Sequence, residues 1–346
     1  MDLLNEEIEE ESTLFEHHRF VVEKGHSMIR IDKYLVNVMP NVSRNRIQDA
    51  ADAKSIVVNG KPVKSNYKVK PLDEISIMLN YPPSQFEIIP QDIPINIVYE
   101  DDDILLVNKQ PGLVVHPGFG NFEGTLLNAV AWHLRDNPSF DANDPRIGLV
   151  HRIDKDTSGL LLLAKNEDAK TKLGRQFFEK TTKRCYNALV WGNVKDDEGT
   201  IDGDLGRDPR DRMLFTVFPN GENPNAKHAV THYKVLERLG YVTLVECRLE
   251  TGRTHQIRVH MKHIGHTLFN DERYGGNEVL KGERTAKYKQ FVQNCFDLCP
   301  RQALHAKTLG FTHPRTGEFM FFDSELPNDM RQLIEKWRRY AAGKEL

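Results

Sequence analysis

Residues 150–160 read VHRIDKDTSGL, and the apolar run Leu160–Ala164 continues directly from them. Charged, turn-prone residues therefore stand immediately before a predicted strand, where a packed sheet can hold a carboxylate in a fixed position against a substrate. Taken alone, the segment is also typical of a solvated turn in which Asp154 or Asp156 caps its own backbone. The choice between these interpretations depends on other segments of the chain.

Residues 249–260 read LETGRTHQIRVH and hold two arginines and two histidines between Arg253 and His260. Because the β-rich stretch Tyr241–Val245 lies just upstream, we predict a strand followed by a turn here, with a helix as the alternative. Alternate residues of a strand share a face, so Gln256 would point the same way as Arg258. A surface strand rarely needs these groups, which makes the segment a candidate functional site.

Three segments together resemble the RluA/RluD-type pseudouridine synthases. HRIDKDTSGL at 151–160 is similar to that family's catalytic motif, GRTHQIR at 252–258 to its arginine motif, and KRCYNALVWG at 183–192 to its tyrosine segment. Further similar segments are VNKQPGLVVHPG (107–118), GTLLNA (124–129), RQALHA (301–306) and FTHP (311–314). The resemblance covers roughly three quarters of the chain, more than one average domain.

The resemblance implies an isomerisation of uridine, in which the N-glycosidic bond breaks, the uracil turns, and C5 joins C1′. One carboxylate can serve by attacking the base or the sugar carbon, and the resemblance assigns this role to Asp154. An ionised carboxylate in a pocket needs a fixed opposite charge, which the resemblance assigns to Arg258, with Arg253 as the alternative. Tyr186 is expected against the uracil face, where its hydroxyl could assist proton removal at C5; a core tyrosine is the alternative.

Access to the base is a separate requirement. A stacked uracil hides its reactive edge, so the nucleotide must be flipped out at a cost of a few kcal/mol. Arg152, adjacent to the nucleophile, could fill the vacated space by stacking its guanidinium plane. The other expected RNA contacts of this region are His151, Arg253, His255 and Gln256. Either histidine could instead orient a loop.

The net charge of −3 conceals an uneven distribution. Residues 1–18 hold seven acids and no Lys or Arg, so the rest of the chain carries a net charge of +4. We expect residues 1–18 to form an acidic disordered tail. Between Arg30 and Lys70 there are nine basic residues against three acidic ones, which indicates a phosphate-binding surface of modest size.

Residues 19–81 resemble the S4 RNA-binding domain. Ile31–Val38 has helical spacing and is stopped by Pro40, and Ser43 is a candidate cap for a second helix. Residues 56–61 are typical of a strand that ends in an Asn-Gly turn. One departure is the stretch Ala53–Ser55, where that family usually has a glycine. The RNA contacts expected here are Arg44, Arg46 and Lys61.

The fold class predicted for the whole chain is α+β. The proline-rich segment at 81–85 places a domain boundary near residue 82 and a linker over 82–92. Residues 93–346 contain short β-rich runs between helical patterns at 169–180 and 330–341, which indicates a catalytic domain on a large, mainly antiparallel mixed sheet. Residues 275–300 interrupt the family-like segments and are predicted to be a surface insertion, with a helix as one possibility.

Composition excludes several classes. The chain has 346 residues, of which 39% are hydrophobic and 28% charged, as expected for a globular protein of two domains. No apolar run approaches the roughly 20 residues of a membrane helix, and the acidic start does not fit a signal peptide. We therefore expect a cytoplasmic monomer. Four scattered cysteines and no phosphate-binding loop predict reduced thiols and neither a metal nor a cofactor.

Three functions from different classes are compatible with the sequence. The first is an RNA pseudouridine synthase with an S4 domain, acting on large-subunit (23S) ribosomal RNA or, as some relatives do, on transfer RNA. The second is a catalytically silent RNA-binding or ribosome-assembly protein, against which the intact Asp154, Tyr186 and Arg258 argue. The third is a hydrolase with Asp154 and Asp156 as a carboxylate pair, which the absence of a sugar-binding aromatic cluster disfavours.

Overall fold

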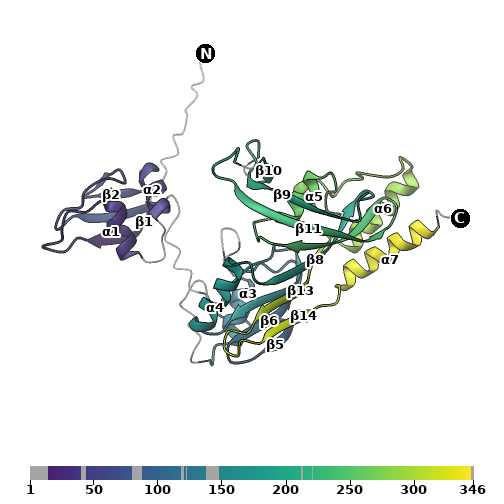
Figure 1. The fold of residues 1–346 in the computed structure, drawn as a ribbon, viewed down its shortest axis with the longest axis horizontal. Helices are drawn as coiled ribbons and strands as arrows, with labels where there is room; N and C mark the ends of the chain where they lie inside the picture. The colour runs from purple at the N-terminus through teal and green to yellow at the C-terminus, as the bar shows by residue number, and fades with distance from the viewer. Residues whose placement is uncertain are drawn as a thin grey trace, which may run out of the picture. The chain divides into compact units, whose positions relative to one another are not determined.

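The computed structural model describes residues 15–39, 44–79, 88–117, 121, 123–137, 148–211, 213–219 and 221–343. Contacts within the chain divide it into two compact units, residues 1–85 and 86–346 (Figure 1). The sequence predicts a boundary near residue 82, and residues 82–87 of the predicted linker lie outside the described part of the chain. Pro40, Ser43 and most of the predicted acidic tail also lie outside it.

The N-terminal unit is a four-stranded antiparallel sheet with two helices. The sheet runs in the order β1-β4-β2-β3. Its strands are β1 (Phe15–Val21), β2 (Ile56–Val58), β3 (Lys61–Pro62) and β4 (Glu74–Leu79), and its helices are α1 (Ile31–Val38) and α2 (Arg44–Asp52). Both predicted helices and the strand after them are confirmed. Side chains such as Leu35, Ile47 and Ile75 form one buried core between helices and sheet.

Two turns of this unit use left-handed backbone conformations. Asn59 and Gly60 have φ angles of 49° and 79° between β2 and β3, which confirms the predicted Asn-Gly turn. Lys54 has a φ of 58° just before β2, in the stretch where the S4 family usually has a glycine. A lysine in this conformation keeps the turn with a small cost in backbone strain.

Asp32 is a buried charge at the start of α1 and organises the basic residues around it. Its carboxylate accepts hydrogen bonds from Arg30 (2.9 Å), Arg44 (3.0 Å) and Gln48 (3.1 Å). Burial alone would raise the pKa of Asp32, but the hydrogen bonds from these three donors outweigh it and lower the pKa to about 2. Arg44 is therefore paired within the unit, while its side chain remains partly exposed.

The C-terminal unit is built on one large sheet that has ten strands among the described residues. Their order is β10-β9-β11-β12-β8-β13-β7-β6-β5, with β14 paired to β13. Neighbouring strands are antiparallel except for β13 and β7. The strands are β5 (Ile97–Glu100), β6 (Ile104–Lys109), β7 (Ser158–Ala164), β8 (Lys183–Trp191), β9 (Glu198–Arg207), β10 (Phe215–Phe218), β11 (Lys227–Arg238), β12 (Val242–Leu249), β13 (Leu304–Thr312) and β14 (Phe319–Asp323). The predicted α+β fold on a mainly antiparallel mixed sheet is confirmed.

The C-terminal unit has five α-helices among the described residues, and α3 and α4 cover the two faces of β7. The five are α3 (Leu126–His133), α4 (Glu167–Phe178), α5 (Gln256–His263), α6 (Ala286–Leu298) and α7 (Asn328–Ala342), with a short 3₁₀ helix at Glu272–Tyr274. Every residue of β7 is buried. Leu161 and Leu163 pack with α3, and Leu160 and Leu162 pack with α4. Because both faces of β7 are covered, the loop that carries Asp154 leads into a firmly packed strand.

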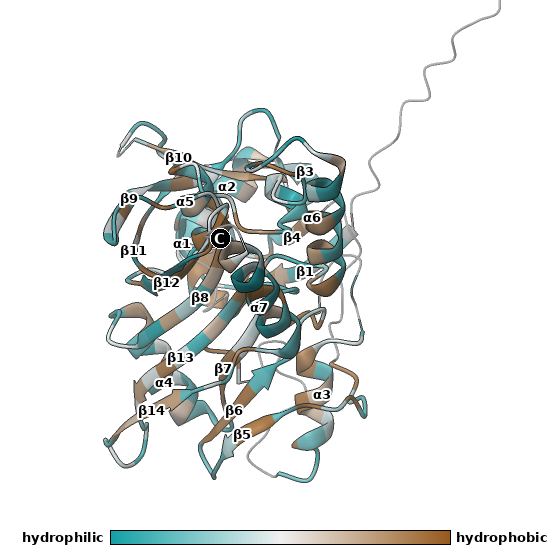
Figure 2. Cartoon of the chain, turned by 90° about the vertical axis from the view of Figure 1, so that its right-hand side faces the viewer, coloured by the Kyte–Doolittle hydropathy of each residue, from teal (hydrophilic) through white to brown (hydrophobic). Residues whose placement is uncertain are grey.

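Helices α6 and α7 pack against each other and carry both hydrophobic and hydrophilic residues (Figure 2). Their buried side chains, including Tyr288, Leu333 and Trp337, share a core with Trp191 of β8. Helix α6 lies in the predicted insertion 275–300, so the helical alternative is confirmed for this segment. Among the described residues, no helix is long and apolar enough to cross a membrane.

The predicted strand over the arginine and histidine motif is wrong. β12 ends upstream, a turn follows, and the residues from Gln256 onward form helix α5. Ile257 and Met261, four residues apart, both enter the core of the sheet, as expected for the buried face of a helix. The helix changes which side chains meet. A strand would point His255 and Arg258 to opposite faces, whereas positions three apart in a helix are neighbours.

Candidate active site

Two buried cations hold the loop that carries Asp154. The first is Lys109 at the end of β6, which donates hydrogen bonds of 2.8–2.9 Å to the backbone oxygens of Gln110, Leu113 and Lys155. Burial lowers the pKa of this ammonium group to about 7. The three backbone oxygens match its three protons, so Lys109 ties the turn after β6 to the residue that follows Asp154.

The second cation is Arg301, which precedes β13. Its Nη1 donates to the backbone oxygens of Asp156 (2.9 Å) and Leu304 (3.1 Å). Its Nε donates to the carboxylate of Asp329 in the first turn of α7 (2.7 Å), and its Nη2 donates to Ser158 Oγ (3.2 Å). One buried guanidinium therefore joins the loop, β13 and α7.

Arg258 of α5 bridges two carboxylates. Its Nη1 donates to Asp154 Oδ2 at 2.9 Å, while its Nε and Nη2 donate to the two oxygens of Asp271 at 2.7 and 2.8 Å. The Asp271 side chain is 1% exposed and the Asp154 side chain 25% exposed. Asp271 therefore anchors the guanidinium from inside the protein, and Asp154 presents its carboxylate to a cavity.

The electrostatics of the pair favour a permanent charge on Arg258. Burial alone would lower the pKa of Arg258, but the hydrogen bonds and charge of Asp271, together with the charge of Asp154, outweigh it and raise the pKa. Arg253, the alternative partner in the sequence interpretation, directs its Nε to the backbone oxygen of His228 instead. The fixed opposite charge at Asp154 thus comes from Arg258.

A cavity of about 280 Å³ contains the exposed edge of Asp154. Tyr186 of β8 and Leu304 of β13 line it together with Arg258. Burial raises the pKa of Tyr186, so its hydroxyl stays protonated at neutral pH. A flat aromatic side chain beside a carboxylate offers a stacking surface for a planar base. A second cavity of about 390 Å³ shares Asp154, His255 and Arg258 with the first.

His255, the residue before α5, reaches the same carboxylate from another direction. Its Nδ1 lies 2.8 Å from Tyr274 Oη, and its Nε2 lies 4.0 Å from Asp154 Oδ2. Burial is the largest cause of the fall in the pKa of His255 to about 4, which the charge of Asp154 opposes and that of Arg258 assists. The imidazole is therefore neutral at physiological pH.

Two other residues expected to contact RNA use their polar atoms inside the protein. His151 accepts a hydrogen bond from the backbone N–H of Leu162 at 2.9 Å and stacks on Phe177. Gln256 accepts from Thr251 and from the backbone of Arg253, and it donates to β11. These contacts favour the loop-orienting interpretation for His151 and a structural role for Gln256.

Arg152 is exposed at the rim of the cavity. Its Nη2 donates to Thr254 Oγ1 at 3.0 Å, which links the loop before β7 to the turn before α5. The residue is exposed, as stacking against nucleotides requires. Of the expected N-terminal contacts, Lys61 is exposed in β3, and the side chain of Arg46 lies outside the described part of the structure.

Sequence reasoning did not single out Arg184, which also lines the cavity. Its guanidinium lies 5.5 Å from the ring centre of Phe177 and packs against Gly252, and its buried Nε has no hydrogen-bond partner among the described residues. Arg184 stands two residues before Tyr186 in β8, so the two side chains share a face of the strand. The two-residue spacing from Tyr186 was the sequence feature that could have identified Arg184 as a cavity residue.

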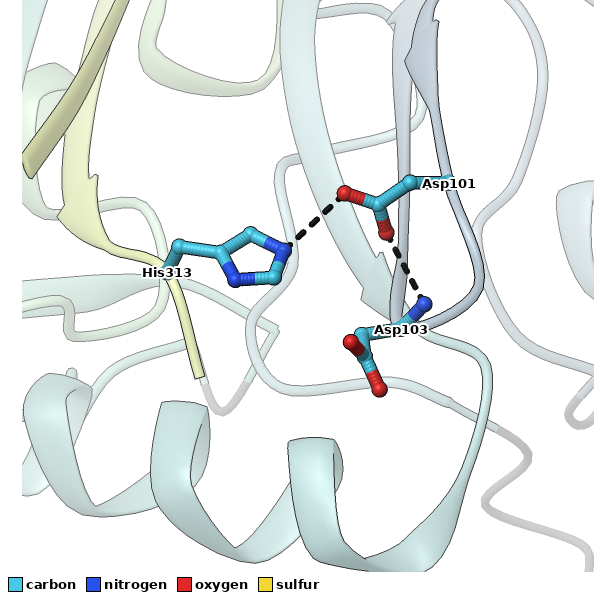
Figure 3. Close-up of side chains that lie close together, drawn as sticks. All are labelled: Asp101, Asp103 and His313. Carbon is cyan, nitrogen blue, oxygen red and sulfur yellow. Dashed lines mark hydrogen bonds and ion pairs between the residues drawn. The ribbon is translucent and has the colours of Figure 1, made fainter. Parts of the chain in front are cut away.

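One group of side chains away from this cavity has the composition of a metal site. Asp101, Asp103 and His313 each have a potential metal-ligand atom, and these atoms lie within 4.8 Å of one another (Figure 3). Asp101 accepts from His313 Nε2 (2.9 Å) and from the backbone of Asp103 (2.8 Å), and Asp103 is paired with Arg315. These contacts join the turn between β5 and β6 to the turn after β13, so the group has a structural explanation.

Comparisons with known proteins agree with this fold. The chain matches the family described as RNA pseudouridylate synthase over residues 103–263 and the S4 domain over residues 29–75. An uncharacterized RNA pseudouridine synthase of Chlorobaculum parvum is 47% identical over 92% of this chain and 96% of its own length. Ribosomal large subunit pseudouridine synthase D of Neisseria meningitidis serogroup B is 41% identical over 89% of this chain and 79% of its own length.

A solved structure of human RNA Pseudouridylate Synthase Domain Containing 1 has a TM-score of 0.50 and 25% identity, and the match covers 72% of this chain and 96% of that one. A carboxylate held by a buried arginine on a mainly antiparallel sheet therefore belongs here to an RNA-modifying isomerase. The chain is a member of the RNA pseudouridylate synthase family and carries an S4 domain.

Proposed function

We propose that this enzyme isomerises specific uridines of large-subunit ribosomal RNA to pseudouridine, with Asp154 as the nucleophile. The observation that carries the chemistry is the bridge from Asp154 through Arg258 to buried Asp271 at the edge of a cavity. The choice of RNA rests on relatives named ribosomal large subunit pseudouridine synthase D, such as those of Neisseria meningitidis and Pasteurella multocida.

In this proposal each polar group near Asp154 has a separate task. Arg258 pairs with the carboxylate and orients it, because its own position is fixed by Asp271. Asp154 attacks the base or the sugar carbon, which divides glycosidic cleavage and rejoining into two easier steps. Overall, the N1–C1′ bond breaks, the C5–C1′ bond forms, the proton on C5 leaves, and N1 gains a proton. No oxidant or energy source is needed.

The aromatic and rim residues handle the base. Tyr186 stacks on the uracil after it leaves the RNA helix, and its hydroxyl oxygen assists the transfer of the C5 proton to water by accepting it as its own proton passes to solvent. Arg152 stacks in the space that the flipped nucleotide vacates. Its position at the cavity rim, one residue from Ile153 and two from Asp154, supports this assignment.

RNA positioning is assigned to the S4 unit. Exposed basic side chains such as Lys61, together with those of Arg44 and Arg46, contact phosphates, while the shape of the RNA and its unstacked bases select the site. A monomeric state and a cytoplasmic location belong to the same proposal. The alternatives are the same chemistry on transfer RNA and a silent RNA-binding protein.

Tritium release from RNA labelled at C5 of uridine tests the proposal. Transcripts of large-subunit ribosomal RNA and of transfer RNA are incubated with wild-type enzyme, Asp154→Asn and Asp156→Asn. We expect release from the ribosomal transcript with the wild type and the Asp156→Asn control, and at least a 10³-fold loss with Asp154→Asn at nearly unchanged RNA affinity, as for other lost nucleophiles. Substantial activity of Asp154→Asn would disprove the nucleophile assignment.

The same reactions separate the proposal from hydrolysis. A hydrolase would release free uracil, whereas an isomerase leaves the base attached to the sugar through C5. Chromatography of the reaction supernatant and of the digested RNA distinguishes the two products. Tritium release from the transfer RNA transcript alone would support the proposed reaction but would show that transfer RNA, not ribosomal RNA, is the substrate.

A further inference from the structure

The backbone at His255 is held in an unusual conformation. His255 has a φ of 56° and a ψ of 21°, the left-handed region that side-chain-bearing residues rarely adopt. It is the residue directly before α5, and its side chain makes no capping hydrogen bond to that helix. Strain of this kind persists where the surroundings hold it, and it often serves to aim a side chain. Here the imidazole is directed into both cavities that border Asp154.

The hydrogen bonds around Tyr274 identify which nitrogen of His255 carries the proton. Tyr274 is 3% exposed, and its Oη accepts a hydrogen bond from the backbone N–H of Phe215 at 3.3 Å. The hydroxyl proton then needs an acceptor, and among the described residues His255 Nδ1, at 2.8 Å, is the acceptor in reach. A buried hydroxyl rarely leaves its proton unpaired, so Nδ1 accepts and Nε2 carries the hydrogen.

The N–H at Nε2 is left without a partner inside the described part of the protein. Its nearest carboxylate oxygen, Asp154 Oδ2, is 4.0 Å away, which is too long for a hydrogen bond. A neutral imidazole beside the Asp154 carboxylate, with its N–H at the wall of a cavity, can donate a hydrogen bond to an acceptor atom of a bound ligand. The acceptor must lie close to the atom that Asp154 attacks.

We propose that His255 binds the O2 carbonyl of the target uracil through its Nε2–H and stabilises the negative charge that develops there. The inference rests on the proposed function. O2 belongs to the carbonyl next to N1, and N1 bears both C1′ and C6, the two carbons that a carboxylate could attack. When the N1–C1′ bond breaks, negative charge spreads over N1 and O2. A preorganised neutral donor favours that charge without neutralising Asp154.

Tyr274 is a positioning residue in this arrangement. Its hydroxyl fixes the tautomer of His255, and the face of its ring lies 5.0 Å from the Arg258 guanidinium. Tyr274→Phe keeps the ring over Arg258 and removes only the hydroxyl. The change removes the partner of His255 Nδ1 and also that of the Phe215 backbone N–H. The part of its effect that disappears in the His255→Phe background is the part that passes through His255.

The test measures the single-turnover rate of pseudouridine formation by chromatography of digested nucleosides. We expect His255→Phe to lower the rate about 10²–10³-fold, as for other lost charge-stabilising donors, with RNA affinity changed less than about threefold. His255→Gln, whose amide can still donate, should keep more of the rate. Exposed His263 on the same helix provides the control, His263→Phe. Tyr274→Phe should lower the rate less, and should have no further effect in the His255→Phe background.

A substituted substrate tests the atom. Sulfur accepts hydrogen bonds weakly. With the wild type, RNA that carries 2-thiouridine at the target position should therefore react at least about tenfold more slowly than RNA that carries uridine. With His255→Phe, the two RNAs should react at the same rate. Because 4-thiouridine changes the other carbonyl, it should affect both enzymes by the same factor.

A His255→Phe rate within about threefold of wild type, additive losses with Tyr274→Phe, or equal 2-thio effects in both enzymes would overturn the inference. Circular dichroism of each variant separates these results from misfolding, and His255→Gln and Tyr274→Phe provide the comparison if His255→Phe does not fold. Wild-type enzyme without activity on any RNA would overturn the proposed function, and the inference with it.

Discussion

Arg258 is shared between two carboxylates, and only one of them is visible in the catalytic motif. Asp271 accepts two hydrogen bonds from Arg258 and lies outside the segments that the sequence analysis singled out. A guanidinium that served Asp154 alone could rotate away from it. The second carboxylate removes that freedom, because it occupies the other edge of the planar group.

Asp271→Asn therefore tests whether Arg258 must be anchored. Loss of one buried charge leaves Arg258 with a single carboxylate, so we expect the free energy of unfolding to fall by about 2–4 kcal/mol and the rate to fall about tenfold or more. Denaturant unfolding and single-turnover kinetics measure the two effects. Glu272→Gln, at an exposed neighbouring position, is the control. An unchanged rate would show that Asp154 alone fixes Arg258.

Among the elements, the loop before β7 depends on contacts that arrive from distant parts of the chain. Lys109 reaches it from the end of β6, and Arg301 reaches it from the segment before β13. Within the loop itself, both cations bind backbone oxygens, those of Lys155 and Asp156. A change of side chain within the loop would therefore leave its course intact, whereas a change of either cation would release it.

The anchoring by Lys109 has a pH signature. The pKa of Lys109 is about 7 in the folded protein and about 10.4 in an unfolded chain. Between these values only the unfolded chain binds the proton, so this residue makes stability rise as pH increases from about 7 to 10. Below about pH 7 both states are protonated and the dependence ends.

Lys109→Met removes the titrating group at similar length. We expect the free energy of unfolding of the wild type to rise between pH 7 and 10 by roughly 2–4 kcal/mol more than that of Lys109→Met. Urea unfolding at several pH values measures the difference, with Lys155→Met as a control for an exposed lysine in the same loop. If the free energy of unfolding changed with pH in the same way for wild type and Lys109→Met, the lowered pKa of Lys109 would be contradicted.

Elements were predictable where local pattern and packing agree. Helices α1, α2, α4 and α7 and strand β7 carry their apolar spacing in their own residues, and all are found. Helix α5 was only the alternative to a predicted strand, because Gln256–His263 has few apolar side chains among its polar and charged ones. Its apolar residues Ile257 and Met261 are recognisable as a buried helix face only from their packing against the sheet. Asp271, the second partner of Arg258, and the half-buried Arg184 were missed for a related reason: their contacts join distant segments.

For the molecule as a whole, our proposal assigns catalysis to the C-terminal unit and RNA binding to the N-terminal unit. The C-terminal unit holds the cavity and Asp154. The N-terminal unit carries the basic stretch between Arg30 and Lys70 on its own small core. Each unit has a core of its own, so loss of the first should leave the chemistry of the second in place.

Deletion of residues 1–85 should weaken RNA binding and flatten its dependence on salt. Each phosphate contact that is lost reduces the magnitude of the slope of log affinity against log salt by about 0.7–0.9. Filter binding across a salt series measures the slope for the full chain and the deletion. The full-length Asp154→Asn variant should keep the wild-type slope. An unchanged slope after the deletion would show that the N-terminal unit does not contact phosphate.

In our proposal, Asp154 of this enzyme forms pseudouridine in large-subunit ribosomal RNA. Carbodiimide treatment and reverse transcription locate pseudouridines in ribosomal and transfer RNA from cells with the gene, without it, and without it but supplied with wild type or Asp154→Asn. We predict that discrete stops in large-subunit RNA disappear without the gene and return with the wild type but not with Asp154→Asn. Stops that persist without the gene, or that Asp154→Asn restores, would contradict the account.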